Sequence, residues 1–109
     1  MNRDVLSELA AIIAARRQSS ADKSYTRQLL DAGAERCAKK FGEEAIEVVI
    51  AALSEDEAHL QAEAADVIYH LLVLLEARGV SVDDVLTVLS ARMARSGLEE
   101  KASRSGMRD

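Results

Sequence analysis

Two pairs of acidic residues in apolar surroundings restrict the fold of this chain more than any other feature. Glu44 and Glu47 form the first pair, and Glu63 and Asp66 form the second. Residues three apart on an α-helix lie on one face, so each pair directs two carboxylates the same way. Ala, Ile and Val flank both pairs, and a carboxylate near a core is costly unless something neutralises it. A hard divalent cation such as Mg²⁺ would do so, because it prefers oxygen ligands.

The composition favours one helical domain. The chain has 109 residues, no proline and only five glycines, and it is rich in Ala, Leu and Glu, which favour helices. Hydrophobic residues make up 49% and charged residues 30%, values typical of a globular chain. We therefore predict an all-α protein, a helical bundle of about four to five helices.

Charge and cysteine content narrow the possible partners. The net charge of −5 argues against nucleic acid and anionic membranes as partners. No apolar run approaches the ~20 residues of a membrane span, and the N-terminus has no apolar signal segment. The one cysteine, Cys37, has no partner for an internal disulfide. These features fit a cytoplasmic protein that binds neither nucleic acid nor membrane.

Apolar spacing and capping residues divide the chain into five helical segments. We expect them at residues 4–17, 24–32, 34–53, 54–78 and, after Ser81, up to about residue 96. Ser54 and Glu57 have the spacing of a capping box, and Gly79 suits a helix stop. The tight turn between segments 34–53 and 54–78 makes them antiparallel neighbours. The two acidic pairs can therefore face each other.

The apolar residues of these two segments predict their buried sides. On the third segment the core side is expected to hold Cys37, Phe41, Ala45, Val48, Val49 and Ala52. On the fourth segment one face carries Leu60, Ala64, Val67, Leu71 and Leu74. Residues 67–75 are apolar almost all round, and such a helix must be covered on most sides. A small domain supplies few covering helices, so we expect a homodimer or a higher homo-oligomer to complete the bundle.

Each candidate site residue also has a simpler interpretation. The acidic pairs could be solvated helix faces. Glu43 could be a metal ligand, a base, or an ordinary ion-pair partner of a nearby lysine. Lys40 could contact a phosphate or simply pair with Glu44 four residues on. His70 could orient Asp66 or contact a phosphate, although a hydrogen-bonded structural histidine is the favoured reading. Cys37 is expected to be a small buried apolar residue.

The acidic motifs resemble those of a known family. The stretches KFGEEAIE (40–47) and EAAD (63–66) are similar to the ExxE…ExxD signature of MazG-like all-α nucleotide pyrophosphohydrolases. Within this superfamily the chain resembles the phosphoribosyl-ATP pyrophosphohydrolases of histidine biosynthesis, from about residue 5 to 104. The stretches that carry this finer resemblance are SYT (24–26), EAADVIYHLLVLL (63–75), RGVSVDDV (78–85) and SGLEEKASR (96–104).

The resemblance implies a fold, a reaction and a set of site residues. It implies a MazG-like domain over residues 1–97, followed by a polar tail over 98–109, and Mg²⁺-dependent hydrolysis of phosphoribosyl-ATP to phosphoribosyl-AMP and pyrophosphate. The expected metal ligands are Glu44, Glu47, Glu63 and Asp66, and the expected catalytic carboxylates are Glu43, Glu44 and Glu47. Phosphate contacts are expected from Lys40, Lys101 and Arg104. The tail could close over substrate or pack on a neighbouring subunit.

Two other functions remain open at this point. A general nucleoside-triphosphate pyrophosphatase would use the same metal chemistry on a free nucleotide. A non-enzymatic helical interaction module would have acidic faces that are merely solvated. A panel of substrates distinguishes the general pyrophosphatase from an enzyme specific for phosphoribosyl-ATP. Pyrophosphate release that depends on Mg²⁺ distinguishes either enzyme from an interaction module.

Overall fold

The computed structural model describes residues 5–94 and residue 101. Its elements are α1 (Val5–Ala15), the 3₁₀ helix η1 (Arg16–Gln18), α2 (Tyr25–Ala32), α3 (Ala34–Ala52), α4 (Glu57–Ala77) and α5 (Val82–Met93). Five α-helices and no strand occur in this part of the chain, which confirms the all-α prediction. None of its helices is long and apolar enough to cross a membrane.

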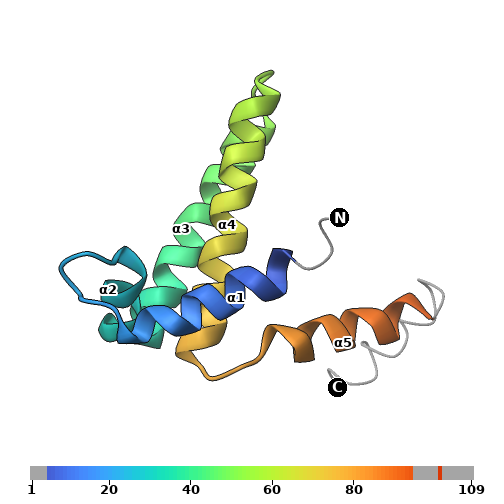
Figure 1. Ribbon diagram of the computed structural model, residues 1–109. Helices are drawn as coiled ribbons and strands as arrows, with labels where there is room; N and C mark the ends of the chain where they lie inside the picture. Colours follow the sequence, from blue (N-terminus) through green and yellow to red (C-terminus); the bar gives the residue numbers. More distant parts are fainter. Residues whose placement is uncertain (1–4, 95–100, 102–109) are drawn as a thin grey trace.

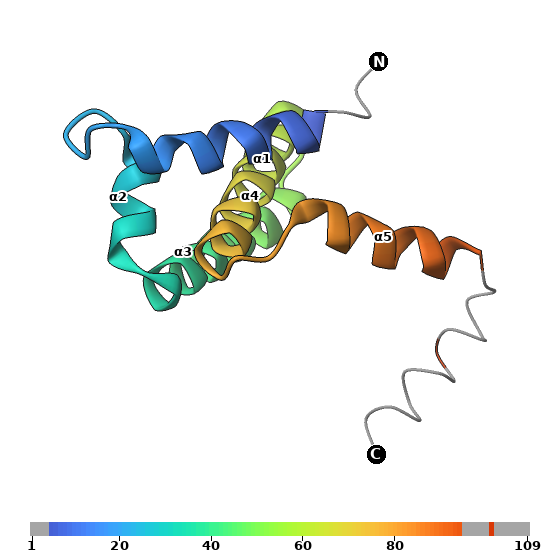
Figure 2. The ribbon, with the colours of Figure 1, turned by 60° about the horizontal axis from the view of Figure 1, so that its bottom comes forward.

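An antiparallel hairpin of α3 and α4 is the centre of the fold (Figure 1). The two helices lie side by side and run in opposite directions, as the short turn between them predicted. α1 lies across the lower half of α4, and α2 packs beside the base of the hairpin. α5 leads away from the other helices (Figure 2). The upper half of the hairpin therefore projects beyond the rest of the molecule.

The buried core lies at the base of the hairpin, where α1, α2, α3 and α4 meet. Its members are Ile13, Leu29, Leu30, Cys37, Leu72 and Val73. Cys37 is 1% exposed, and its Sγ donates a hydrogen bond to the main-chain oxygen of Leu29 at 3.2 Å. The expectation that Cys37 is a small buried residue is confirmed.

Serine and aspartate side chains begin three of the helices. Ser24 accepts a hydrogen bond from the Arg27 amide at the start of α2, and Ser81 accepts one from the Asp83 amide at the start of α5. The capping box predicted from Ser54 is wrong, because Asp56 caps α4 and accepts from the His59 amide. The Ser54 hydroxyl instead donates to the last turn of α3, at the Ala51 oxygen. A carboxylate also suits the positive end of the helix dipole.

Gly79 ends α4, as predicted. Its φ of +68° lies in the left-handed region, which glycine adopts without strain. The Gly79 amide donates to the Glu76 oxygen at 3.0 Å, and the Val80 amide donates to the Leu75 oxygen at 2.9 Å. These two bonds form a Schellman motif, which satisfies carbonyls that the helix end would leave unpaired.

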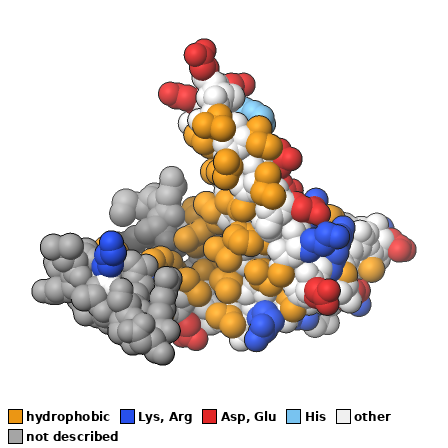
Figure 3. Space-filling model, turned by 180° about the vertical axis from the view of Figure 1, so that it is seen from behind, with side chains coloured by type: hydrophobic (Ala, Val, Ile, Leu, Met, Phe, Trp, Pro, Cys, Tyr) orange, Lys and Arg blue, Asp and Glu red, His pale blue; other side chains and the backbone are white. Residues whose placement is uncertain are grey.

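The upper half of the hairpin is less buried than its apolar sequence predicted. Val49 is 61% exposed and Ala52 is also exposed, although both were expected on a buried face. Leu71, lower on α4, was expected to be buried as well and is exposed. In this half α3 and α4 cover only each other, so a single strip of each helix is buried, as at Ala51. Figure 3 shows hydrophobic side chains running from the projecting end of the hairpin toward its base.

Candidate metal centre

Three carboxylates from the two hairpin helices converge at one place. Glu44 of α3 meets Glu63 and Asp66 of α4, and one ligand oxygen from each lies within 4.8 Å of the others. Glu44 and Glu63 are partly buried, and Asp66 is exposed. Glu63 and Asp66 are three residues apart and therefore share one face of α4. The antiparallel pairing of α3 and α4 places Glu44 opposite that face. Three of the four predicted metal ligands are thus adjacent.

Two of the three carboxylates of this cluster have a basic side chain as a neighbour. Lys40 Nζ lies 3.8 Å from Glu44 Oε1, and His59 Nε2 lies 3.4 Å from Glu63 Oε1. Within residues 5–94, the carboxylate of Asp66 has no hydrogen-bond or ion-pair partner.

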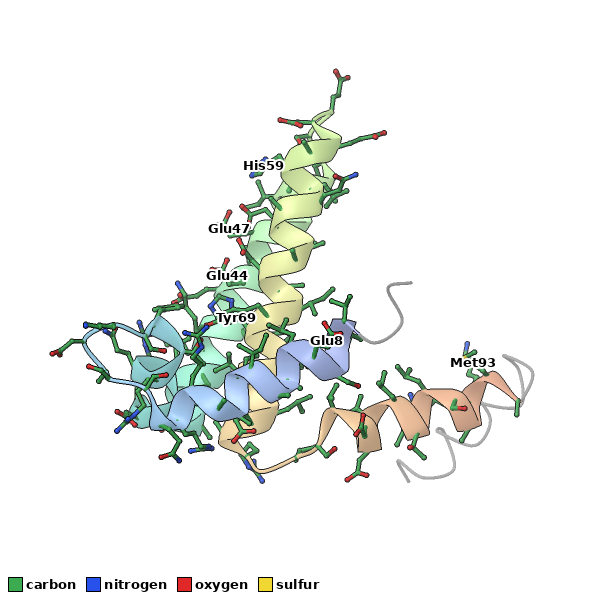
Figure 4. All side chains as sticks on the ribbon, viewed as in Figure 1. Glu8, Glu44, Glu47, His59, Tyr69 and Met93 are labelled. Carbon is green, nitrogen blue, oxygen red and sulfur yellow. The ribbon has the colours of Figure 1, made fainter. Side chains whose placement is uncertain are left out.

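The fourth predicted ligand, Glu47, lies beside the cluster. It is exposed and one helical turn from Glu44 on α3, and the three converging carboxylates do not include it. Figure 4 shows Glu44 and Glu47 projecting to the same side of the hairpin, with His59 farther along that side. Glu43 is also exposed, and its Oε1 lies 3.7 Å from Lys40 Nζ. Lys40 thus contacts two carboxylates at the edge of the cluster.

His70 is a buried, hydrogen-bonded residue, as the favoured interpretation expected. It is 6% exposed, and its Nδ1 lies 2.8 Å from the main-chain oxygen of Asp66. On its other side, Nε2 lies 3.4 Å from the hydroxyl of Tyr25. The neighbouring Tyr69 hydroxyl lies 2.5 Å from Thr26 Oγ1. His70 therefore links α2 to the turn of α4 that contains a cluster carboxylate.

Sequence reasoning missed the contacts of Tyr25 and His59. Tyr25 follows the N-cap residue Ser24, which could have placed it at the start of a helix, but nothing in the sequence indicated that this helix end faces His70. His59 was expected on the surface and is exposed. Its spacing of four residues before Glu63 was the available signal for their contact.

Of the two cations predicted in the tail, the structure describes only Lys101. Lys101 is exposed, and it makes no hydrogen bond or ion pair with the cluster in the described part of the chain. Arg104 and the other predicted tail residues, apart from Lys101, lie outside the described residues. The prediction that the tail supplies phosphate contacts therefore remains a prediction.

The donor set of the cluster fits a hard divalent cation. All three groups offer carboxylate oxygens, which suit Mg²⁺, Ca²⁺ and Mn²⁺ better than softer metals. No cysteine or histidine belongs to the three converging groups. A cation held here would also relieve the mutual repulsion of the carboxylates. Because one side of the site is exposed at Asp66, an anionic ligand has access to it.

Comparisons with known proteins agree on one family. A family model described as phosphoribosyl-ATP pyrophosphohydrolase matches residues 6–93. The chain is similar to phosphoribosyl-ATP pyrophosphatase 1 of Bradyrhizobium diazoefficiens, with 58% identity over 95% of this chain and 98% of the relative. It is 56% identical to phosphoribosyl-ATP pyrophosphatase 1 of Rhodopseudomonas palustris, over 95% of this chain and 97% of the relative. The phosphoribosyl-ATP pyrophosphatase of Nitrobacter hamburgensis is also 56% identical, over 96% and 98%.

Proposed function

The chain belongs to the phosphoribosyl-ATP pyrophosphohydrolase family, and we propose that its Glu44–Glu63–Asp66 cluster is the Mg²⁺ centre of that activity. The family's reaction, in histidine biosynthesis, converts phosphoribosyl-ATP to phosphoribosyl-AMP and pyrophosphate. The observation that supports the site is the convergence of three carboxylate oxygens within 4.8 Å. We include Glu47 as a fourth candidate ligand because it projects to the same side one turn away.

The reaction explains why a cationic centre is needed. Hydrolysis breaks the anhydride bond between the α- and β-phosphates, adds water across it and leaves negative charge on pyrophosphate. The triphosphate also repels an approaching nucleophile. Mg²⁺ bound by these carboxylates would supply positive charge to the phosphates and lower the pKa of water in the site.

The surrounding residues have distinct proposed roles. A carboxylate must take the proton that the attacking water loses, and Glu43 and Glu47 are the exposed candidates. Lys40 would move from its carboxylate partners to a substrate phosphate, which offers a charge-assisted hydrogen bond. Lys101 and Arg104 are proposed as further phosphate contacts from the tail.

We also propose that the chain works as a homodimer. Ile46, Val49, Ile50 and Leu53 form an exposed apolar stripe along the projecting half of α3, at the spacing of one helical face. On α5, Leu89 and Met93 are exposed as well, the latter at 83%. The radius of gyration is 16.2 Å, whereas a compact chain of 100 residues has about 13 Å. A second copy would cover apolar surface that this chain leaves open.

The test of this function is pyrophosphate release from two substrates, each with and without Mg²⁺. The proposal expects rapid release from phosphoribosyl-ATP, little release from ATP, and loss of both after chelation. Equal release from ATP would indicate a general nucleoside-triphosphate pyrophosphatase. Release that is unaffected by chelation would contradict the metal centre.

A further inference from the structure

The first turn of α2 forms a platform that hydrogen bonds connect to the preceding loop. Ser24 is buried and caps the helix. The guanidinium of Arg27 donates to the Ser19 oxygen at 2.6 Å and to the Asp31 carboxylate at 2.9 Å. The side-chain amide of Gln28 donates a hydrogen bond to the main-chain oxygen of Ala21 at 2.7 Å. These hydrogen bonds connect the loop before α2 to the helix and restrain its first residues.

Two neighbouring residues of this platform contact two neighbouring residues of α4. Thr26 contacts Tyr69 hydroxyl to hydroxyl. Tyr25 contacts His70 through its hydroxyl and through an edge-to-face ring contact with centroids 6.1 Å apart. The second contact continues toward the metal centre, because His70 also bonds the main chain of Asp66. The first contact reaches His70 only through ring packing, because the Tyr69 ring lies edge to face against the His70 ring with centroids 4.9 Å apart.

The hydrogen-bond chemistry gives this connection a direction. A main-chain oxygen only accepts, so Nδ1 of His70 must carry the proton that it donates to Asp66. In the neutral ring Nε2 is then the acceptor, and the Tyr25 hydroxyl donates to it. The sequence of donors runs from Tyr25 to His70 to the Asp66 main chain. This sequence selects one tautomer and one orientation of the buried ring.

We infer that Tyr25 is a positioning residue for Asp66, acting through His70 on the backbone that carries this carboxylate. The other two cluster carboxylates have side-chain neighbours of their own, Lys40 and His59. In the described chain, Asp66 has only this support from outside its own helix. Docking of α2 therefore sets where the Asp66 carboxylate points. The inference rests on the proposed metal centre, since it assigns a role to a ligand of that centre.

The test compares Tyr25→Phe with Thr26→Val. Each variant removes one hydroxyl contact between α2 and α4, but only Tyr25→Phe removes a hydrogen bond to His70, the residue that bonds the main chain of Asp66. Tyr25 is the better position to change, because replacing the buried His70 also removes packing. The probe is Mn²⁺, which takes the same oxygen ligands as Mg²⁺, titrated into the full-length chain by calorimetry. Melting temperatures measured without metal report the cost to docking in both variants.

We expect Tyr25→Phe to weaken Mn²⁺ binding about tenfold, the lower end of the effect of groups that orient metal ligands. Half-maximal activity should need correspondingly more Mg²⁺, with kcat at saturating Mg²⁺ nearly restored. Thr26→Val should lower the melting temperature similarly and leave Mn²⁺ affinity unchanged. Unchanged affinity in Tyr25→Phe, or equal losses in both variants, would overturn the positioning role.

Asp66→Asn separates this inference from the proposed function. If Asp66→Asn loses Mn²⁺ binding and Tyr25→Phe keeps it, the metal centre stands and the positioning role fails. If Asp66→Asn binds Mn²⁺ as the parent chain does, the assignment of the metal centre itself is wrong.

Discussion

The ammonium group of Lys40 lies 3.8 Å from Glu44 Oε1 and 27% of its side chain is exposed, so a cation sits beside the carboxylate cluster. In the free chain Lys40 offsets part of the negative charge of the site. If a substrate triphosphate binds at the cluster as proposed, its oxygens would compete with Glu44 for this ammonium group. The contact is therefore consistent with a lysine that exchanges partners during binding.

Lys40→Gln should affect metal and substrate in opposite directions. Loss of the cation should raise the affinity of the free chain for Mn²⁺ slightly, since a partly exposed pair is worth at most about 1 kcal/mol. It should raise KM for phosphoribosyl-ATP by about tenfold, because a hydrogen bond to a charged group contributes about 1.5 kcal/mol or more. Lys39→Gln, an exposed neighbour with the same charge change, is the control. An unchanged KM in Lys40→Gln would show that Lys40 does not contact the substrate and only forms an ion pair with Glu44.

Asp66→Asn and Glu47→Gln keep the shape of a ligand and remove its charge. Each should lower pyrophosphate release by at least about 100-fold, because losing the charge of a ligand should cost no less than losing a group that orients one. Without metal, Asp66→Asn should melt at a higher temperature because repulsion within the cluster is relieved. Glu55→Gln, at the exposed turn between α3 and α4, should change neither property. Near-wild-type release from both ligand variants would contradict the assignment.

Val49→Glu tests the exposed apolar stripe of α3. In light scattering the parent chain should have twice the mass of the 11.8 kDa chain. A charge in the middle of the stripe should shift the mass toward one chain, because it cannot be buried without a partner. Gln18→Glu makes the same charge change at an exposed residue of η1 and should leave the dimer intact. A parent chain that stays monomeric at micromolar concentration would contradict the dimer.

Deletion of residues 98–109 tests the proposed role of the tail. If Lys101 and Arg104 contact substrate phosphates, the deletion should raise KM or lower kcat. The affinity of the free chain for Mn²⁺ and the mass in solution should stay the same, since the cluster and the stripe of α3 are intact. Unchanged kinetics would reject phosphate contacts from the tail, and loss of the dimer would indicate packing on a second copy.

Stability should fall at alkaline pH because of Cys37. Burial raises the pKa of this thiol above its ordinary value of 9.0, and nearby Arg17 lowers it by a smaller amount. A folded-state pKa above the unfolded one means that the full stabilisation is present below pH 9 and is lost as the pH rises toward the folded-state value. Denaturant unfolding from pH 8 to 10.5 measures this loss. Cys37→Ala should flatten the dependence, although it also removes packing; an equally steep dependence in that variant would assign the loss to other groups.

The sequence alone was sufficient for the helical class, the family resemblance and most helix limits. Residues near each other in the chain carry these signals, as at Gly79, where a left-handed residue closes α4. The acidic pairs could be found the same way, because a spacing of three residues places carboxylates on one helix face. The cap of α4 was misassigned since Ser54 and Asp56 both suit an N-cap, and only the backbone path selects Asp56.

The tertiary structure decided which carboxylates meet and what supports them. The register between α3 and α4 brings Glu44 to Glu63 and Asp66 and leaves Glu47 outside the converging three, and helix spacing within either segment says nothing about that register. The contact of Tyr25 with His70 joins residues 45 positions apart. Such contacts depend on how helices pack, which the local pattern of either helix does not encode. Local periodicity therefore determined the helices and their acidic faces, whereas packing determined the geometry of the site.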